Sequence, residues 1–169
     1  MGRSISTEPE RLRRCHREVC SRLVQGVPAN IRAKAGLGEA NSLSIIGDYF
    51  RTRSGDPDFV KAAEFYKQAA SIGDAKSMYY LGLFHRYGTG VKLDTQLTIH
   101  YWFKSAGKGA NALAQYELGL AYLNGDILPT NLQEAHRWLT LALTSGSVDK
   151  ESINAALALC KERNRLIDK

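Results

Sequence analysis

Apolar and small residues return every three or four positions through much of the chain, which is the spacing of a buried face on an α-helix. One such face comprises Ala75, Met78, Leu81, Gly82 and His85. The pattern stops at the glycine-rich stretch 88–90, and a second helical pattern begins after Asp94. This part of the chain therefore predicts two helices joined by a turn.

The same pattern occurs three times, in units that begin at Ala40, Ala75 and Ala112 with a period of 35 to 37 residues. Five kinds of position agree across the units: a glycine in the first helix (Gly47, Gly82, Gly119), an Asp or Asn (Asp58, Asp94, Asn131), a small residue (Ala62, Thr98, Ala135), an aromatic residue (Phe65, Tyr101, Trp138) and a closing glycine (Gly73, Gly109, Gly146). The Asp or Asn is suited to cap a second helix, and Pro57 would occupy the first helical position of one copy. A glycine inside the first helix would let its partner helix approach closely. Such a helix pair cannot bury its apolar face alone, so we expect stacked neighbours to complete the core.

The second unit, AKSMYYLGLFHRYGTGVKLD followed by YWFKSAGKGA, resembles the Sel1-like repeat, a relative of the tetratricopeptide repeat with a longer loop between its helices. The resemblance covers residues 37–147 and implies an all-α, right-handed α-solenoid with repeats at 37–74, 75–110 and 111–147. Three features depart from the family pattern. The first unit has RSGDPD in place of the glycine turn, and Thr98 replaces the small alanine. His85 stands where Phe50 and Tyr122 supply an aromatic residue in the other units.

Both ends of the chain are predicted to be helical caps, because a solenoid needs cover for its terminal faces. Residues 1–36 form a basic N-terminal cap, with a capping box at Thr7–Glu10 and a short second helix over 29–35. Its apolar stripe is Leu12, Cys15, Val19 and Leu23. Residues 148–169 form a C-terminal cap, with a helix over 149–167 whose stripe is Ile153, Ala156, Leu157, Cys160 and Ile167.

Positive charge is concentrated near the N-terminus. Residues 1–35 contain eight Lys or Arg and three Glu, so they carry five of the six net positive charges of the 169-residue chain. A nucleic-acid footprint over the whole surface is therefore not supported. The helix RLRRCHREVCSR leaves one alternative open, binding of nucleic acid or an anionic membrane, although Glu8, Glu10 and Glu18 favour a solvated cap. Residues Gly2 to Ser6 also fit the loose myristoylation pattern, and the sequence leaves open whether Gly2 is myristoylated.

No motif in the chain indicates catalysis, a metal or a cofactor. The GTG at 88–90 follows a helix rather than a strand and has no Lys-Ser or Lys-Thr after it, so we interpret it as a turn. Cys15, His16 and Cys20 are too few for a zinc site. His85 has no local nucleophile, and Asp94 and Asp126 are expected to cap helices, which favours a packed histidine over a hydrolytic one. An odd number of cysteines and no signal-peptide stretch predict a cytoplasmic protein.

The remaining candidate for function is a surface. In helix-pair solenoids the first helices line the concave side, and helical spacing around Leu81 predicts which side chains face outward there. These positions are Asn41, Ser44, Asp48 and Arg51 in the first unit, Lys76, Tyr79, Leu83 and Arg86 in the second, and Leu113, Tyr116, Leu120 and Leu123 in the third. All but Ser44 are candidate partner-binding residues, since exposed Tyr, Leu and Arg side chains favour protein contacts. Cover by a neighbouring first helix is the alternative for Tyr79 and Tyr116.

The sequence thus predicts a non-catalytic module that holds a protein partner, either a peptide or a folded domain, in the concave groove. The resemblance implies an adaptor, or a stoichiometric inhibitor such as an immunity protein that neutralises a cognate toxin. No small-molecule substrate is expected. A homodimer through an uncovered cap or groove fits the pattern equally well.

Overall fold

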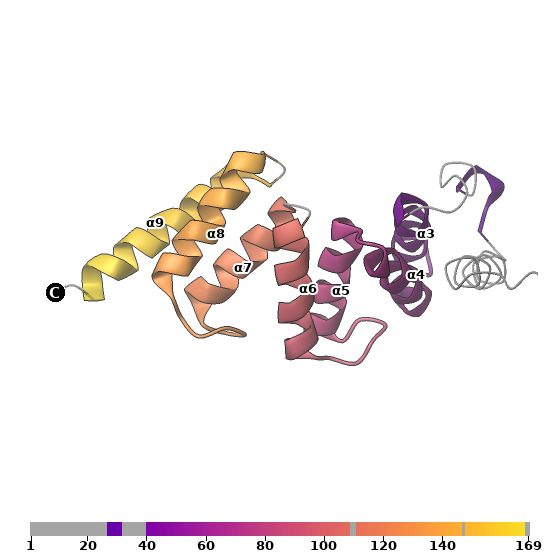
Figure 1. Ribbon diagram of the computed structural model, residues 1–169, viewed down its shortest axis with the longest axis horizontal. Helices are drawn as coiled ribbons and strands as arrows, with labels where there is room; N and C mark the ends of the chain where they lie inside the picture. The colour runs from indigo at the N-terminus through magenta and orange to yellow at the C-terminus, as the bar shows by residue number, and fades with distance from the viewer. Residues whose placement is uncertain (1–26, 32–39, 109–110, 147, 168–169) are drawn as a thin grey trace, which may run out of the picture.

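The computed structural model describes residues 27–31, 40–108, 111–146 and 148–167, and these residues contain helices but no strand. The long helices are α3 (Ala40–Thr52), α4 (Phe59–Ser71), α5 (Ala75–Tyr87), α6 (Thr95–Lys108), α7 (Ala112–Asn124), α8 (Leu132–Ser145) and α9 (Lys150–Ile167). They pack as three hairpins, α3–α4, α5–α6 and α7–α8, and α9 follows them. The hairpins succeed one another along the long axis of the molecule (Figure 1). The predicted α-solenoid is confirmed.

Polar residues fix the helix starts as the sequence predicted. The Asp58 carboxylate accepts a hydrogen bond from the Lys61 amide at 2.9 Å, and Asn131 accepts from the amides of Gln133 and Glu134. One detail of the prediction is wrong, since α4 begins at Phe59 and Pro57 precedes the cap instead of opening the helix. Asp58 takes the cap because its short side chain reaches the first free amides.

The glycine-rich stretch after α5 is a turn, as expected. Gly88 ends α5 in the left-handed conformation with φ of 67°, and its amide donates to the Phe84 carbonyl. Glycine adopts this conformation without the steric penalty that a side chain brings. The equivalent Gly125 ends α7 in the same way, with φ of 74°.

Each hairpin is held together where a large side chain of the second helix lies over the glycine of the first. A Cβ atom at Gly47 would lie 2.7 Å from the ring of Tyr66, and one at Gly82 would lie 2.2 Å from the ring of Trp102. At Gly119 it would lie 2.7 Å from Leu139. The three large residues differ in chemistry but occupy the same place, so the glycine sets the distance between paired helices.

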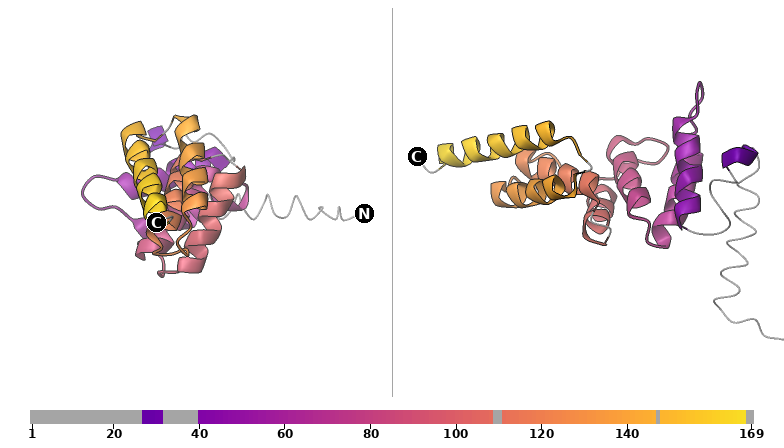
Figure 2. Two further views of the ribbon diagram at one scale, coloured as in Figure 1. Left: turned by 90° about the vertical axis from the view of Figure 1, so that its left-hand side faces the viewer. Right: turned by 90° about the horizontal axis from the view of Figure 1, so that it is seen from above.

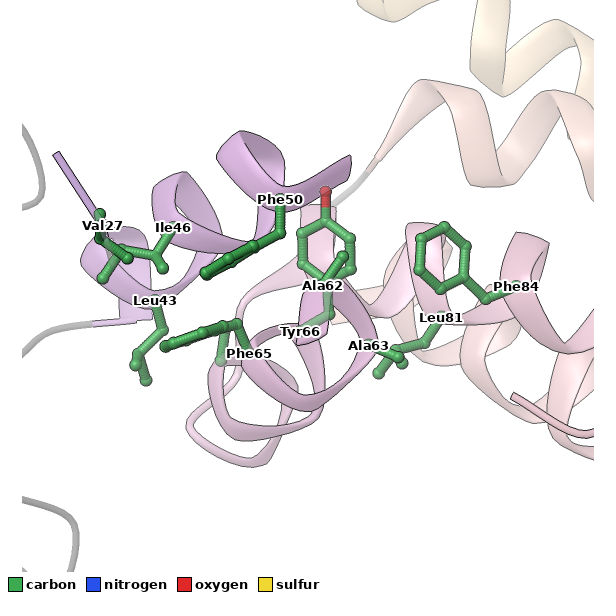
Figure 3. Packing of buried hydrophobic residues seen from close by; sticks show 11 residues of the cluster. Val27, Leu43, Ile46, Phe50, Ala62, Ala63, Phe65, Tyr66, Leu81 and Phe84 are labelled. Atoms are coloured by element: carbon green, nitrogen blue, oxygen red, sulfur yellow. The ribbon is translucent and has the colours of Figure 1, made fainter. Parts of the chain in front are cut away.

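Aromatic rings connect the first hairpin to the second (Figure 3). Phe50 of α3 and Phe65 of α4 stack with centroids 5.6 Å apart. Tyr66 then reaches across to α5, where its ring lies 5.2 Å from Tyr80 and 5.8 Å from Phe84. The core is therefore continuous between hairpins, which is how a solenoid buries faces that a single hairpin would expose.

Helix α9 covers the last hairpin and lies at the end of the molecule opposite α3 (Figure 2). Ile153, Ala156 and Cys160 are buried in one cluster with Leu139. Leu157 is half-buried, as a residue at the edge of this stripe should be. Ile167 was predicted on the stripe but is 73% exposed. The stripe ends earlier because Ile167 lies two helical turns beyond Cys160, the last deeply buried residue of α9.

Part of the N-terminal prediction falls outside the described residues. The basic helix, its capping box, Cys15, His16, Cys20 and Gly2 all lie in residues 1–26, and most of the predicted short helix lies in 32–39. Within the described segment, Ala29, Asn30 and Ile31 are helical, and Val27 packs against Leu43 and Ile46. In the part of the chain that the structure covers, no helix combines the length and apolar character needed to cross a bilayer.

Candidate functional site

Nine of the predicted partner-binding residues keep at least part of their side chain exposed on the first helices α3, α5 and α7. Asn41 and Lys76 are exposed, and the rest are half-buried. We call this set the first-helix face: Asn41, Asp48, Arg51, Lys76, Leu83, Arg86, Leu113, Tyr116 and Leu120.

Outward exposure, one of the two alternatives left open for Tyr79, is wrong, because the next hairpin covers its ring. Tyr79 is only 7% exposed and lies in a cluster with Trp102, Ala114 and Leu118. The alternative of cover by the neighbouring first helix therefore applies to Tyr79. Tyr116, for which the same question was open, stays half-exposed.

The exposure expected for Leu123 and Ser44 is also wrong. Leu123 is 1% exposed because α9 covers the end of α7, where Ile153 and Cys160 pack in the same cluster. Arg163 of α9 also donates a hydrogen bond to the Leu123 carbonyl. Ser44 is 2% exposed, so the polar character of the face in the first repeat comes from Asn41, Asp48 and Arg51.

Charged and phenolic groups connect the first two repeats at this face. The Asp48 carboxylate accepts hydrogen bonds from the Tyr66 hydroxyl at 2.7 Å and from Lys76. Arg51 donates to the Tyr66 hydroxyl at 3.0 Å and to the Tyr80 hydroxyl at 3.4 Å. Burial, followed by the hydrogen bond to Asp48, raises the pKa of Tyr66 well above its ordinary range. The network holds α3, α4 and α5 in register and leaves Lys76 at its exposed edge.

The junction between the second and third repeats uses one ion pair instead. Arg86 of α5 pairs with Asp126 in the loop after α7, and its guanidinium lies 5.6 Å from the Trp102 ring centroid. Desolvation is the largest single effect on the Asp126 carboxyl, but the hydrogen bond and charge of Arg86 together with backbone hydrogen bonds outweigh it, so the pKa of Asp126 is lowered. Asp126 was predicted to cap a helix. It does not, because Asn131 caps α8 and Asp126 is drawn to Arg86.

Apolar side chains lie between these charged junctions. Leu83 and Leu113 are partly buried against the cluster around Trp102, while Tyr116 and Leu120 are partly buried against the cluster around Leu139. Leu113, Tyr116 and Leu120 are spaced at three and four residues along α7, so they project from one side of that helix. The first-helix face is thus polar over α3 and apolar over α7.

Glu117 is the feature of this face that the sequence analysis missed. It is half-buried on α7, and burial, the largest effect on it, raises the pKa of its carboxyl group. The spacing around Leu81 did not include its position. The alignment of the three repeats could have identified Glu117, because the equivalent residues are Ile45 and Tyr80 and neither carries a charge.

His85 is a packed residue. It is 6% exposed, its ring stacks on Tyr101 with centroids 5.9 Å apart, and its Nδ1 lies 3.0 Å from the Lys92 carbonyl oxygen. Because that carbonyl can only accept, Nδ1 carries the proton in this contact. The imidazole therefore fixes the loop after α5. Among the described residues, no three metal-ligating side chains converge.

Stacked helix hairpins with one open, chemically graded face define the molecule as an α-solenoid scaffold, a class whose members bind proteins along an extended surface. Residues 46–74, 75–109 and 112–147 match the Sel1 repeat, which is more than half of the chain. The protein belongs to the Sel1 repeat family, as the resemblance predicted.

Curated relatives share the repeats but are longer. The chain is 37% identical over 87 residues to HRD3A of Arabidopsis thaliana, an ERAD-associated E3 ubiquitin-protein ligase component, covering 51% of this chain and 13% of HRD3A. It is 29% identical over 128 residues to the Sel1-repeat-containing protein YjcO of Escherichia coli, covering 71% of this chain and 55% of YjcO. This chain thus spans about half of YjcO and a small part of HRD3A.

Solved structures agree on the fold. A Sel1 repeat protein from Oxalobacter formigenes superposes with a TM-score of 0.64 at 24% identity, over 72% of this chain and 47% of its own. A protective antigen of uropathogenic Escherichia coli with an SLR fold superposes with a TM-score of 0.62 at 26% identity. That match covers 78% of this chain and 30% of the antigen. The Sel1 repeat is a scaffold for protein interaction, and these matches place this chain on that scaffold.

Proposed function

We propose that this chain is a cytoplasmic adaptor or stoichiometric inhibitor that binds a protein partner through its first-helix face. The observation that carries the proposal is the partly exposed apolar row of α7, Leu113, Tyr116 and Leu120, which no helix among the described residues fully covers. Partly exposed tyrosine and leucine side chains next to charged groups have the composition of a protein interface.

Two further observations support a binding role. Most charged groups of the first-helix face are already engaged within the chain, as in the pairs Arg86–Asp126 and Lys76–Asp48. A pre-ordered surface loses less conformational entropy when a partner binds. In addition, HRD3A is a ligase component by name, which is compatible with an adaptor role for this shorter chain.

The cytoplasmic location is supported by the cysteines. Their number is odd, and Cys160 is a free thiol on the buried side of α9. A reducing compartment keeps such a thiol intact.

The test compares two double variants of the full chain. Tyr116→Ala/Leu120→Ala truncates the apolar row, while Val60→Ala/Leu141→Ala truncates two exposed residues of the second helices α4 and α8. A partner is first identified by affinity capture, then purified and titrated calorimetrically against each variant. We expect the first-helix variant to bind at least about tenfold more weakly, because central interface residues contribute about 2 kcal/mol or more.

The control variant should bind like the unmodified chain, and both variants should keep the helical circular dichroism spectrum. A partner that binds the α7 variant normally and loses affinity for the α4/α8 variant would place the interface on the second helices and refute the proposal.

A further inference from the structure

Tyr79 has a buried ring and a hydroxyl without a partner. Tyr79 as a whole is only 7% exposed, and its ring lies in the cluster with Ala114 and Leu118. Among the described residues, no hydrogen bond reaches the Tyr79 hydroxyl, and its oxygen does not belong to the fully enclosed polar atoms that lack a partner. The hydroxyl therefore lies at the edge of the buried ring, where a group from outside the chain can reach it.

Glu117 lies on α7, the helix whose Ala114 and Leu118 pack in one cluster with Tyr79. It follows Ala114 by three residues and precedes Leu118 by one, so it projects from the side of α7 that covers the Tyr79 ring. After burial, the charge of Glu117 is the next effect that raises the pKa of Tyr79, in keeping with this placement on α7. Glu117 is half-buried and forms no hydrogen bond or ion pair with any residue that the structure describes.

The preceding junction shows how the chain satisfies the equivalent position. Tyr80 corresponds to Glu117, and Arg51 corresponds to Arg86. The Arg51 guanidinium lies 4.3 Å from the Tyr80 ring centroid and donates to the Tyr80 hydroxyl. One repeat later, Arg86 pairs with Asp126 instead, so the cation that Glu117 would use is already committed.

We propose that Tyr79 and Glu117 form a notch that receives a lysine or arginine side chain of the protein partner. The Glu117 carboxylate accepts charge-assisted hydrogen bonds from the cation, and the Tyr79 oxygen accepts one more. Leu113 and Leu120 lie one helical turn to either side of Glu117, so the partner presents a basic residue between apolar ones. This inference rests on the proposed function and names the chemistry that the first-helix face selects.

The charges around the notch are unbalanced. Within the described ranges, Arg86 is the one cation shown to act on both Glu117 and Asp126, so a basic partner residue would restore neutrality. Removing a buried carboxylate from solvent is costly unless a cation pairs with it, so an apolar partner residue at this point would be rejected.

The test uses short random peptides displayed in a library and selected on the full chain. Recovered peptides are synthesised and titrated calorimetrically against the unmodified chain, Glu117→Gln, Tyr79→Phe and Tyr116→Ala/Leu120→Ala. Glu64→Gln is the matched control, because it removes the same charge from an exposed position on α4. Tyr79→Phe keeps the buried ring and removes only the hydroxyl.

We expect the peptides to share a lysine or arginine at one fixed position. Replacing it with norleucine should weaken binding about tenfold to the unmodified chain and to Glu64→Gln, but less than about twofold to Glu117→Gln. For Tyr79→Phe the loss should fall to about fivefold, because one of the hydrogen bonds is missing.

Two results would overturn the inference, and they are distinguishable. In the first result, the peptides bind through Tyr116 and Leu120 but share no basic residue, or norleucine at that residue weakens binding equally to the unmodified chain and to Glu117→Gln. This result would refute the notch and leave the proposed function standing. Peptides that bind the Tyr116→Ala/Leu120→Ala variant normally would refute both.

Discussion

Glu117 carries a charge at a repeat position where the sister hairpins have Ile45 and Tyr80. Its carboxylate is half-buried and unpaired among the described residues, and burial raises its pKa. A folded-state pKa above the unfolded value means that the folded chain holds this proton more tightly. Glu117 therefore lowers the stability of the fold at neutral pH, a cost expected of a residue kept for binding.

The predicted consequence is a pH-dependent gain for Glu117→Gln. At neutral pH the variant should be more stable than the unmodified chain by on the order of 1 kcal/mol. The reason is that a neutral glutamine amide avoids the cost of desolvating a carboxylate charge on folding. The difference should shrink as the pH falls through the raised pKa and vanish below the ordinary value of 4.5. Urea denaturation over a pH series measures it.

Glu64→Gln serves as the control and should show little such difference, since Glu64 is exposed. A loss of stability for Glu117→Gln at neutral pH would mean that Arg86 or another internal cation already satisfies the carboxylate.

At the scale of the helix pair, a missing side chain fixes the geometry. Gly47, Gly82 and Gly119 each accept a bulky residue of the paired helix, although that residue is Tyr66, Trp102 or Leu139. The repeat therefore constrains the distance between its two helices more strongly than it constrains which side chain packs between them.

We predict that Gly82→Ala lowers the free energy of unfolding by about 1–3 kcal/mol. Its Cβ would lie 2.2 Å from the Trp102 ring, which is fully buried and cannot move without disturbing its neighbours. Gly107→Ala is the matched control on α6, because nothing lies within 4 Å of its added Cβ. That substitution should be neutral or stabilise the fold by up to about 1 kcal/mol. Equal effects in thermal or urea unfolding would show that close helix approach does not depend on Gly82.

Over the whole molecule, stability passes from one hairpin to the next. The apolar clusters are shared by neighbouring hairpins, and α9 completes the last one through Ile153, Ala156 and Cys160. In such an array each unit depends mainly on its immediate neighbours.

We predict that Ile153→Ala costs about 2–4 kcal/mol, because Ile153 of α9 is fully buried against the last hairpin. Amide hydrogen exchange should accelerate most in α7, α8 and α9 and least in α3 and α4. Leu159→Ala, on the same helix but 45% exposed, should change stability by less than about 0.5 kcal/mol. Uniform acceleration over all helices would show that the chain unfolds as one cooperative unit.

The sequence by itself determined the helices of the repeats, their pairing into hairpins and the capping residues Asp58 and Asn131. These features depend on contacts between residues close along the chain, which leave a periodic pattern of apolar, glycine and Asp or Asn positions. The threefold repetition of that pattern also distinguished a solenoid from other all-α folds, because it requires successive hairpins to bury equivalent faces.

Only the tertiary structure decided which side chains remain available to a partner. Tyr79 and Leu123 satisfy the same spacing as Lys76 and Leu120, yet α7 and α9 cover them. Glu117 falls outside that spacing, yet it stays partly exposed on α7. Helical periodicity describes the faces of one helix, whereas cover depends on how far each neighbouring hairpin is shifted and rotated, and that is set by packing between residues distant in the chain.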